Sequence, residues 1–244
     1  IAEQIAEMAA RLRQHDSAAP MGSISRAAIY LGAPWGQPDL VAGSPSFVDT
    51  MRDTVRHELN VLGDIEHSFF TNTGGVLGGV SRALPHDDTY LLCVVGGEVT
   101  ELLLVHNHSA SGYATLPLGT HTLVRTMRAH GFTDVETHSA MRLPMSNDIE
   151  PMLAAQRHFA KEFEAAVSPL LHNTNIKRVW VVSRGELGEW FAKALSNSAE
   201  IAGLFPQGGE VRVLRASHIA PHMSAHAHEP DLLLGLHALH AEVV

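Results

Sequence analysis

The segment LLCVVGGEVTELLLV spans residues 91–105 and carries the most regular pattern in the chain. Two apolar runs flank the glycine pair Gly96 and Gly97, and each run has the length of one buried strand. Glycine tolerates positive φ, so glycine pairs are frequent in tight turns between antiparallel strands. The pattern therefore predicts strands over residues 89–95 and 98–105, joined by a turn at the two glycines.

Downstream of this segment, helical and strand patterns alternate. A third short strand over residues 113–116 completes a meander. Apolar residues at helical spacing predict a long helix from Ile149 to Val167, with Asn147 or Asp148 as its N-cap. The other expected elements are a helix over 119–129, a strand over 178–182, a helix over 187–195, a strand over 211–214 and a helix over 232–240. This order predicts a mixed α/β fold.

The patterns before the meander are weaker. We expect an amphipathic helix over 1–15, a small-residue linker over 17–23, a strand over 27–31, a loop over 35–45, a helix that starts at 44–46 and runs to 59, and a strand over 67–70. Residues 71–79 contain four glycines and nearly match the spacing of a phosphate-binding P-loop. Val80 stands where the lysine of that loop belongs, so we predict a flexible loop there.

The composition is typical of a soluble, globular chain. Of 244 residues, 45% are hydrophobic and 18% charged, and the net charge of −9 argues against nucleic acid as a partner. No apolar run reaches the roughly 20 residues of a membrane span. Cys93 lies within a predicted strand, which favours a small buried side chain over a reactive thiol. The chain starts at Ile1 without Met and without a signal peptide, and we expect it to be a fragment or to lack preceding residues.

The turn at Gly96 and Gly97 has two interpretations. It is an ordinary hairpin turn, or it is a place where backbone N–H groups cradle phosphate oxygens, since no Cβ blocks the approach of a ligand. The pattern alone favours the ordinary hairpin.

Context favours the second interpretation. The segment resembles the second phosphate motif of the actin, sugar-kinase and heat-shock-chaperone superfamily, and more narrowly that of the PilM and FtsA branch. Residues 114–120 (ATLPLGT) resemble the strand and Pro-x-Gly step of that branch, residues 178–188 (RVWVVSRGELG) its adenosine motif, and residues 230–236 (PDLLLGL) the start of its last helix. The resemblance covers about residues 60–244 and is strongest to uncharacterised bacterial PilM-like proteins.

The resemblance implies an actin-like (ribonuclease H-like) mixed sheet flanked by helices. It implies a partial first subdomain over residues 1–85 and a second subdomain over 86–244. The function implied is a scaffold of pilus or cell-envelope assembly that binds protein partners, on the cytoplasmic face of the membrane and attached to it only peripherally; self-association stays open. The implied cofactors are ATP and Mg²⁺, and the residues expected at the nucleotide are Gly96, Gly97, Glu98, Thr100, Gly119, Ser183 and Gly185.

Several departures from the family pattern predict a degenerate nucleotide site and at most a weak ATPase. Val94 stands where the family has an Asp that orients magnesium-bound water, and a Val offers no oxygen ligand. Glu98 places a carboxylate beside the expected phosphate, Arg184 and Glu186 replace glycines of the adenosine loop, and the first phosphate motif is not found. Thr100 and the neighbouring Glu101 either face a ligand or are polar only because of the alternation of side chains along the strand. Both options stay open.

The histidines supply the rival function. The chain has 17 of them, and His218, His222, His226, His228, His237 and His240 lie near its end. The His222 and His226 pair would share one helical face, a spacing that suits zinc, and Glu229 and Asp231 could add oxygen ligands. Two prolines flank the stretch and favour a solvated loop over a metal site. A metal-dependent hydrolase that uses these histidines is therefore the alternative to the scaffold function. A serine hydrolase is not supported, because Ser183 lacks the preceding glycine of a nucleophile elbow.

Overall fold

The structure is a computed structural model in which the chain separates into two compact units, residues 1–72 and 73–244. The residues that the structure describes are 26–31, 45–59, 65–142, 149–171, 174, 176–205, 209–223 and 231–242. The first of these units ends at Asn72, and the subdomain boundary expected at residue 85 stays a prediction. That the units correspond to actin-like subdomains stays a prediction.

The described part of the first unit is a β-α-β arrangement. Strands β1 (Arg26–Leu31) and β2 (Glu66–Thr71) pair in parallel, and α2 (Pro45–Leu59) lies between them in the chain. Parallel neighbours need such a crossover, because the chain must return to the same end of the sheet. Tyr30 stacks on Phe70 across the pair, with 5.5 Å between the ring centroids.

A five-stranded mixed sheet forms the centre of the second unit, in the order β5-β4-β3-β6-β7. β3, β4 and β5 form the antiparallel meander, whereas β6 and β7 run parallel to β3. The strands are β3 (Thr89–Val95), β4 (Thr100–His106), β5 (Ser109–Leu116), β6 (Arg178–Ser183) and β7 (Glu210–Val213). The mixed sheet expected from the sequence is confirmed.

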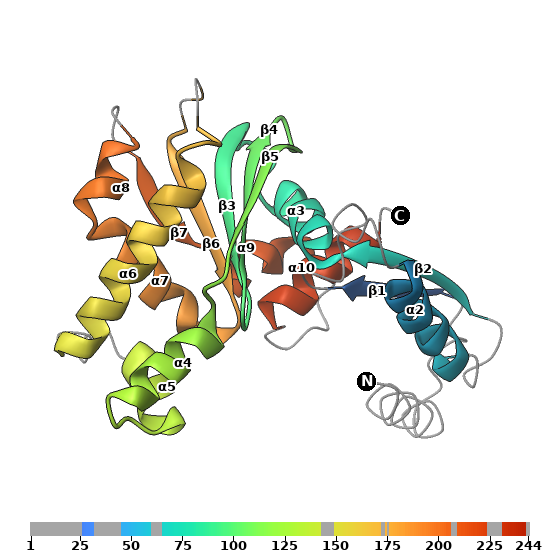
Figure 1. Cartoon of the computed structure of the whole chain (residues 1–244). Coiled ribbons are helices and arrows are strands. Elements are labelled where there is room, and N and C mark those ends of the chain that lie inside the picture. The colour runs from blue at the N-terminus through green and yellow to red at the C-terminus, as the bar shows by residue number, and fades with distance from the viewer. Residues whose placement is uncertain are drawn as a thin grey trace. The chain divides into compact units, whose positions relative to one another are not determined.

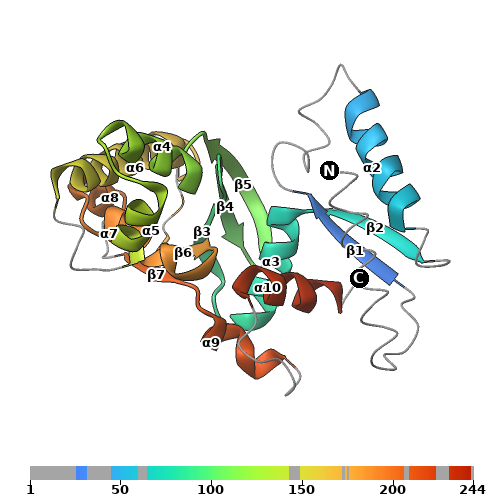
Figure 2. The same cartoon turned by 90° about the horizontal axis from the view of Figure 1, so that it is seen from below.

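Helices cover both faces of this sheet (Figures 1 and 2). One layer contains α4 (Thr120–Ala129), α5 (Asp134–Arg142), α6 (Glu150–Val167), α7 (Gly188–Ser196) and α8 (Ala199–Gly203); the other contains α3 (Asn72–Ala83), α9 (Ala216–Ile219) and α10 (Leu232–Ala241). Along β3, Leu91, Cys93 and Val95 pack in the core beneath the first layer, and the residues between them pack beneath the second. This alternation follows from the pleat of a strand buried on both faces.

Cys93 is fully buried in the first of these cores. Burial raises the pKa of its thiol well above the ordinary value, because the thiolate would lose its hydration. The expectation of a buried, unreactive side chain is confirmed.

The prediction of a flexible glycine-rich loop over residues 71–79 is wrong, because these residues belong to α3. Tertiary packing explains the glycines. A Cβ at Gly79 would lie 2.3 Å from the carbonyl oxygen of Leu236 in α10, and one at Gly78 would lie 2.3 Å from the ring of His240. The glycines therefore let α3 and α10 approach closely, which outweighs the poor helix propensity of glycine.

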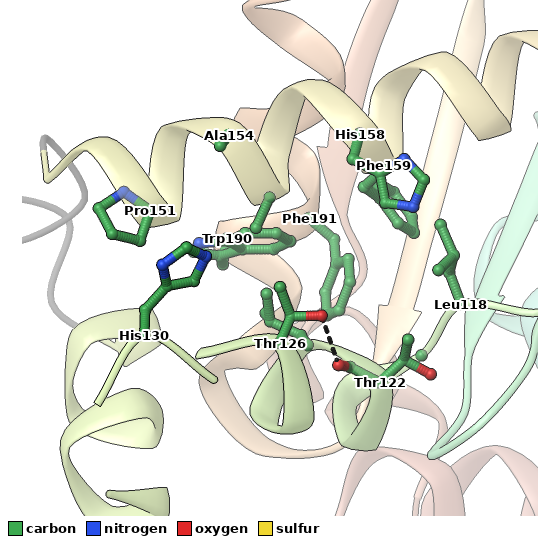
Figure 3. A pocket seen from close by; sticks show the side chains of 13 residues that line it. Leu118, Thr122, Thr126, His130, Pro151, Ala154, His158, Phe159, Trp190 and Phe191 are labelled. Carbon is green, nitrogen blue, oxygen red and sulfur yellow. Dashed lines mark hydrogen bonds between the residues drawn. The ribbon is translucent and has the colours of Figure 1, made fainter. Parts of the chain in front are cut away.

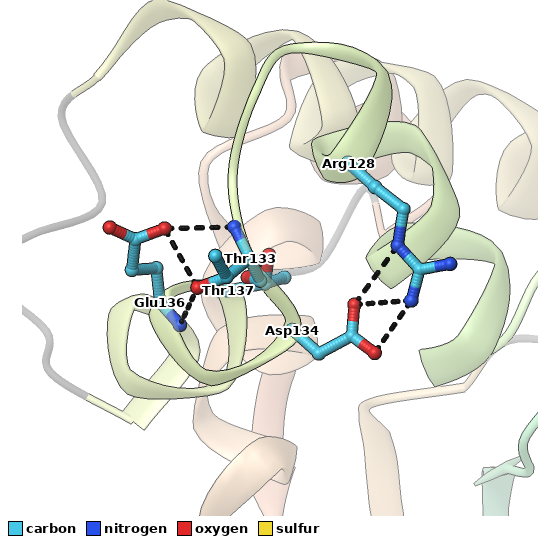
Figure 4. A network of polar contacts seen from close by, with 5 residues as sticks. All are labelled: Arg128, Thr133, Asp134, Glu136 and Thr137. Atoms are coloured by element: carbon cyan, nitrogen blue, oxygen red, sulfur yellow. Dashed lines mark hydrogen bonds and ion pairs between the residues drawn. The ribbon is translucent and has the colours of Figure 1, made fainter.

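The connection between α4 and α5 is fixed by local polar contacts (Figure 4). Thr133 and Glu136 form a capping box: the Glu136 N–H donates to Thr133 Oγ1 at 3.2 Å, and the Thr133 N–H donates to Glu136 Oε2 at 2.8 Å. The Arg128 guanidinium donates to both carboxylate oxygens of Asp134 at 2.6 Å. The corner thus holds α5 against the end of α4.

Most other expected elements are confirmed within a few residues. The sequence did not predict the helices α5, α8 and α9, and the N-cap of α6 is Ile149 with no side-chain cap. The expected N-caps Asn147 and Asp148, the helix over 1–15, the linker over 17–23 and the loop over 35–44 lie outside the described residues. Within the part of the chain that the structure covers, no helix has the combined length and hydrophobicity of a bilayer crossing.

Candidate functional site

The candidate site lies at the carboxyl ends of β3 and β6, which are neighbours in the sheet. Val95 at the end of β3 is in register with Ser183 at the end of β6. The turn with Gly96 and the loop with Gly185 therefore leave the sheet at one edge. Ligands of α/β proteins bind outside the carboxyl ends of such strands.

The turn between β3 and β4 is clamped to the start of α4. The N–H of Thr120 donates to the Gly96 carbonyl at 3.0 Å, and the N–H of His121 donates to the Gly97 carbonyl at 2.7 Å. These bonds satisfy two of the orphan amides of a helix start. Gly119 has extended backbone angles that any residue adopts, yet a Cβ there would lie 2.4 Å from the Gly97 oxygen. Glycine is therefore required at position 119 because the two backbone segments lie close together, and not because of its φ angle.

The clamp leaves two turn donors without an acceptor. The Gly96 N–H donates across the turn to the Val99 carbonyl at 3.0 Å. For the N–H groups of Gly97 and Glu98, the described residues provide no acceptor. Adjacent amides of this kind can donate hydrogen bonds to an anion.

The carboxylate of Glu98 is paired with side chains of α4. Arg125 donates to both of its oxygens, at 2.7 and 2.6 Å, and His121 Nδ1 lies 3.5 Å from Oε1. The hydrogen bonds from Arg125 hold the pKa of Glu98 below its ordinary value, so the carboxylate is charged and paired near neutral pH. The predicted repulsion of a phosphate by Glu98 is thereby reduced. Sequence reasoning did not single out Arg125, because nothing local signals its pairing with a residue in the turn.

Thr100 and Glu101 have structural roles. Thr100 is fully buried, and its hydroxyl donates to the Leu118 carbonyl at 2.6 Å. Glu101 is also buried, and it accepts a hydrogen bond from the Tyr113 hydroxyl at 2.9 Å. The expectation that Thr100 faces a ligand is corrected on this basis: Thr100 ties the β5–α4 connection to β4, which holds Gly119 against the turn.

The loop after β6 supplies the second side of the edge. Gly185 has φ of +57°, a conformation that favours glycine, and it begins the short 3₁₀ helix η3 (Gly185–Leu187). Ser183 is 2% exposed, and its hydroxyl has no hydrogen-bond partner in the described structure. The loop departs from the family pattern at Arg184, which is exposed.

Val94 occupies the position at which the resemblance implies a carboxylate near magnesium. Val94 is 3% exposed and packs in the core beneath α3 and α10. Neither Glu98, paired with Arg125, nor the buried Glu101 replaces that carboxylate. Among the described side chains at the ends of β3 and β4, the carboxylates of Glu98 and Glu101 are both hydrogen-bonded within the protein.

The histidines near the end of the chain have separate environments where they are described. Asp231 caps α10 by accepting from the N–H groups of Leu233 and Leu234, and His218 Nδ1 accepts from the Arg215 N–H at 3.0 Å. Among the described residues, no three His, Cys, Asp or Glu side chains are grouped as metal ligands would be. His226, His228 and Glu229 lie outside the described residues, so the hydrolase alternative gains no support from the site.

Comparisons with known proteins identify the fold but no close relative. Neither a protein family model nor a curated protein sequence matches the chain. A chain of the PilM-PilN type IV pilus biogenesis complex is similar in structure, with a TM-score of 0.53 and 13% identity over 77% of this chain. The ethanolamine utilization protein EutJ from Carboxydothermus hydrogenoformans has a TM-score of 0.56 and 14% identity over 98% of this chain and 72% of its own length.

A third similar structure is MreB 5 of Spiroplasma citri bound to AMPPNP, with a TM-score of 0.53 and 10% identity over 86% of this chain and 70% of its own. The chain spans only 56% of the length of its counterpart in the PilM-PilN complex. At these identities the likeness concerns the arrangement of helices and strands.

Proposed function

Because this chain has the actin-like ATPase fold, we propose that it is a scaffold protein that binds a nucleotide through the turn at residues 96–98 and hydrolyses it slowly or not at all. The observation that carries the proposal is the pair of unengaged N–H groups of Gly97 and Glu98. They lie at the carboxyl edge of the sheet beside the loop with Gly185. The similar MreB 5 structure is bound to AMPPNP, which supports a nucleotide as the ligand.

The same edge supports weak hydrolysis. Val94 is buried in the core and supplies no oxygen to a magnesium shell. Glu98 is paired with Arg125, which disfavours its use as a base. Binding without turnover suits a protein that uses a nucleotide to stabilise one conformation for a partner.

Isothermal titration with Mg-ATP and with AMPPNP tests this proposal on the full chain. We expect both to bind and no phosphate release from ATP. The matched variants are Gly97→Pro, which deletes one N–H donor, and Gly97→Ala, which keeps it; both introduce a Cβ against the His121 ring. Gly97→Pro is expected to bind about 10- to 150-fold more weakly than Gly97→Ala, since a hydrogen bond to a charged group contributes about 1.5–3 kcal/mol.

Two results would contradict the proposal. Equal affinity of the two variants would remove the turn from the site. Rapid phosphate release by the unaltered chain would show that a group other than Val94 and Glu98 supplies the catalytic oxygen.

The proposed partner is a protein component of pilus or envelope assembly, at the cytoplasmic face of the membrane. The similar PilM-PilN structure is a complex of pilus biogenesis proteins, which supports this choice. Deletion of the gene should reduce the number of surface pili or alter the envelope in electron micrographs, and a fluorescent fusion should lie at the membrane. Normal pili and envelope together with a diffuse fusion would refute the scaffold role.

A further inference from the structure

A mostly apolar pocket of about 230 Å³ lies between α4, α6 and α7 (Figure 3). Its base is a cluster of three aromatic side chains, Phe159, Trp190 and Phe191. The ring centroids of Phe159 and Phe191 lie 4.9 Å apart, as do those of Trp190 and Phe191. Thr122, Thr126, His130 and His158 also line the pocket and make its wall partly polar.

One buried polar group in this pocket has no partner. Trp190 is 1% exposed, and its Nε1–H has no acceptor in the described structure. Buried indole N–H groups almost always donate a hydrogen bond, because leaving one unpaired costs about 1–3 kcal/mol. The exposed His130 and the buried Trp190 both line the pocket (Figure 3). Because the Nε1 atom is buried, a ligand reaches it only when a side chain that lines the pocket, such as His130, rotates away.

The size of the pocket limits its occupant. An apolar cavity of roughly 150 Å³ accepts benzene in another protein, so about 230 Å³ suits one to two fused rings. The aromatic base favours a flat ring, and the unpaired N–H favours a ligand with a hydrogen-bond acceptor.

The pocket is lined by residues other than 96–98, although Gly119, which lies against the turn, belongs to its lining. The turn lies at the carboxyl edge of the sheet, whereas the pocket is lined by the three helices and by Leu118 and Gly119 of the β5–α4 connection. No residue of the turn itself lines the pocket.

We propose that the pocket between α4, α6 and α7 is a second binding site, for a small aromatic ligand of one to two rings whose acceptor atom is bound by Trp190 Nε1–H. The helices provide the apolar walls, and the indole nitrogen fixes the orientation of the ligand. The site does not depend on nucleotide binding.

Quinoline and naphthalene are the probes, because they share one shape and only quinoline carries an acceptor. Titrations followed by NMR use the indole N–H signals of the three tryptophans, of which Trp190→Phe identifies one. Both probes should move the Trp190 signal and leave that of Trp180, which packs in the opposite core, in place. In isothermal titrations, which do not need the Trp190 signal, Trp190→Phe should weaken quinoline about three- to tenfold more than naphthalene, as the loss of one hydrogen bond predicts.

A blocking variant and a competitor complete the test. Ala154 is exposed at the pocket, and Ala154→Phe should abolish the binding of both probes while the melting temperature stays near that of the unaltered chain. AMPPNP should not displace quinoline. The proposal is overturned if neither probe moves the Trp190 signal, if Trp190→Phe weakens both probes equally, or if AMPPNP displaces quinoline, which would assign the pocket to the nucleotide itself.

Discussion

Gly119→Ala should destabilise the chain by opening the clamp between the β3–β4 turn and α4. The new Cβ would lie 2.4 Å from the Gly97 carbonyl oxygen and 2.7 Å from that of Gly96. Both are backbone atoms, so the turn must retreat by about 1 Å to reach ordinary van der Waals contact. A retreat of that size takes the bonds from Thr120 and His121, now 3.0 and 2.7 Å long, to or beyond the limit of hydrogen bonding.

Loss of these two hydrogen bonds sets the magnitude. Each contributes about 0.5–1.5 kcal/mol, so we expect the free energy of unfolding to fall by about 2 kcal/mol. For a chain of this size, that is a decrease of about 4–8 °C in Tm. Nucleotide affinity should fall as well, because the Gly97 and Glu98 N–H groups move with the turn.

Urea and thermal unfolding followed by circular dichroism measure the first effect, and hydrogen exchange at the Thr120 and His121 amides locates it. The matched control is Gly203→Ala at the end of α8, where an added Cβ meets nothing within 4 Å. The control should leave stability unchanged or slightly increased. Unchanged stability of Gly119→Ala, with the two amides as protected as before, would refute the clamp.

Three further perturbations test other parts of the second unit. Arg125→Gln should raise the pKa of Glu98 towards its ordinary 4.5, measured by NMR titration of the carboxyl group; an unchanged midpoint would show that Arg125 does not hold the carboxylate. Gly79→Ala should lower the free energy of unfolding by about 1–3 kcal/mol in urea titrations, because its Cβ would lie 2.3 Å from the backbone of Leu236; a neutral effect would contradict the close packing of α3 and α10. Burial lowers the pKa of His240, so the folded chain favours the neutral imidazole, and stability should fall as the pH drops below the ordinary pKa of 6.5. His240→Gln should therefore reduce the difference in the free energy of unfolding between pH 7.5 and pH 5.5. An unchanged difference would contradict this role of His240.

The sequence predicted the parts of the fold that local patterns control. The β3–β4–β5 meander needs only apolar runs, short turns and tolerant turn residues, all of which are contiguous in the chain. The polar run DVETHSAMR of α5 has little helical periodicity, and its helix depends on the capping box and on the ion pair with Arg128. The glycines of α3 were misinterpreted because their reason lies in α10, far away in sequence.

In the candidate site, too, some features were predicted from the sequence and others depend on tertiary packing. The glycines at 96, 97 and 119 were recognised from a resemblance in order and spacing, and the structure brings them together. The pairing of Glu98 with Arg125 and the burial of Thr100 depend on where α4 meets the turn. The pocket with Trp190 is formed by three helices that are separated in the chain, and no pattern within any one of them predicts an unpaired N–H.

Side chains of β3 alternate between the two cores of the sheet, and this alternation limits insertions and deletions in the strand. A single residue inserted between Leu91 and Val95 would send every later side chain of the strand into the opposite core, and it would carry the turn away from α4. A second insertion nearby would restore the facing of the strand but not its register with β6. Insertions and deletions in descendants of this gene should therefore be rare in β3 and collect at the turn of Asn107 and His108, where added residues extend into solvent.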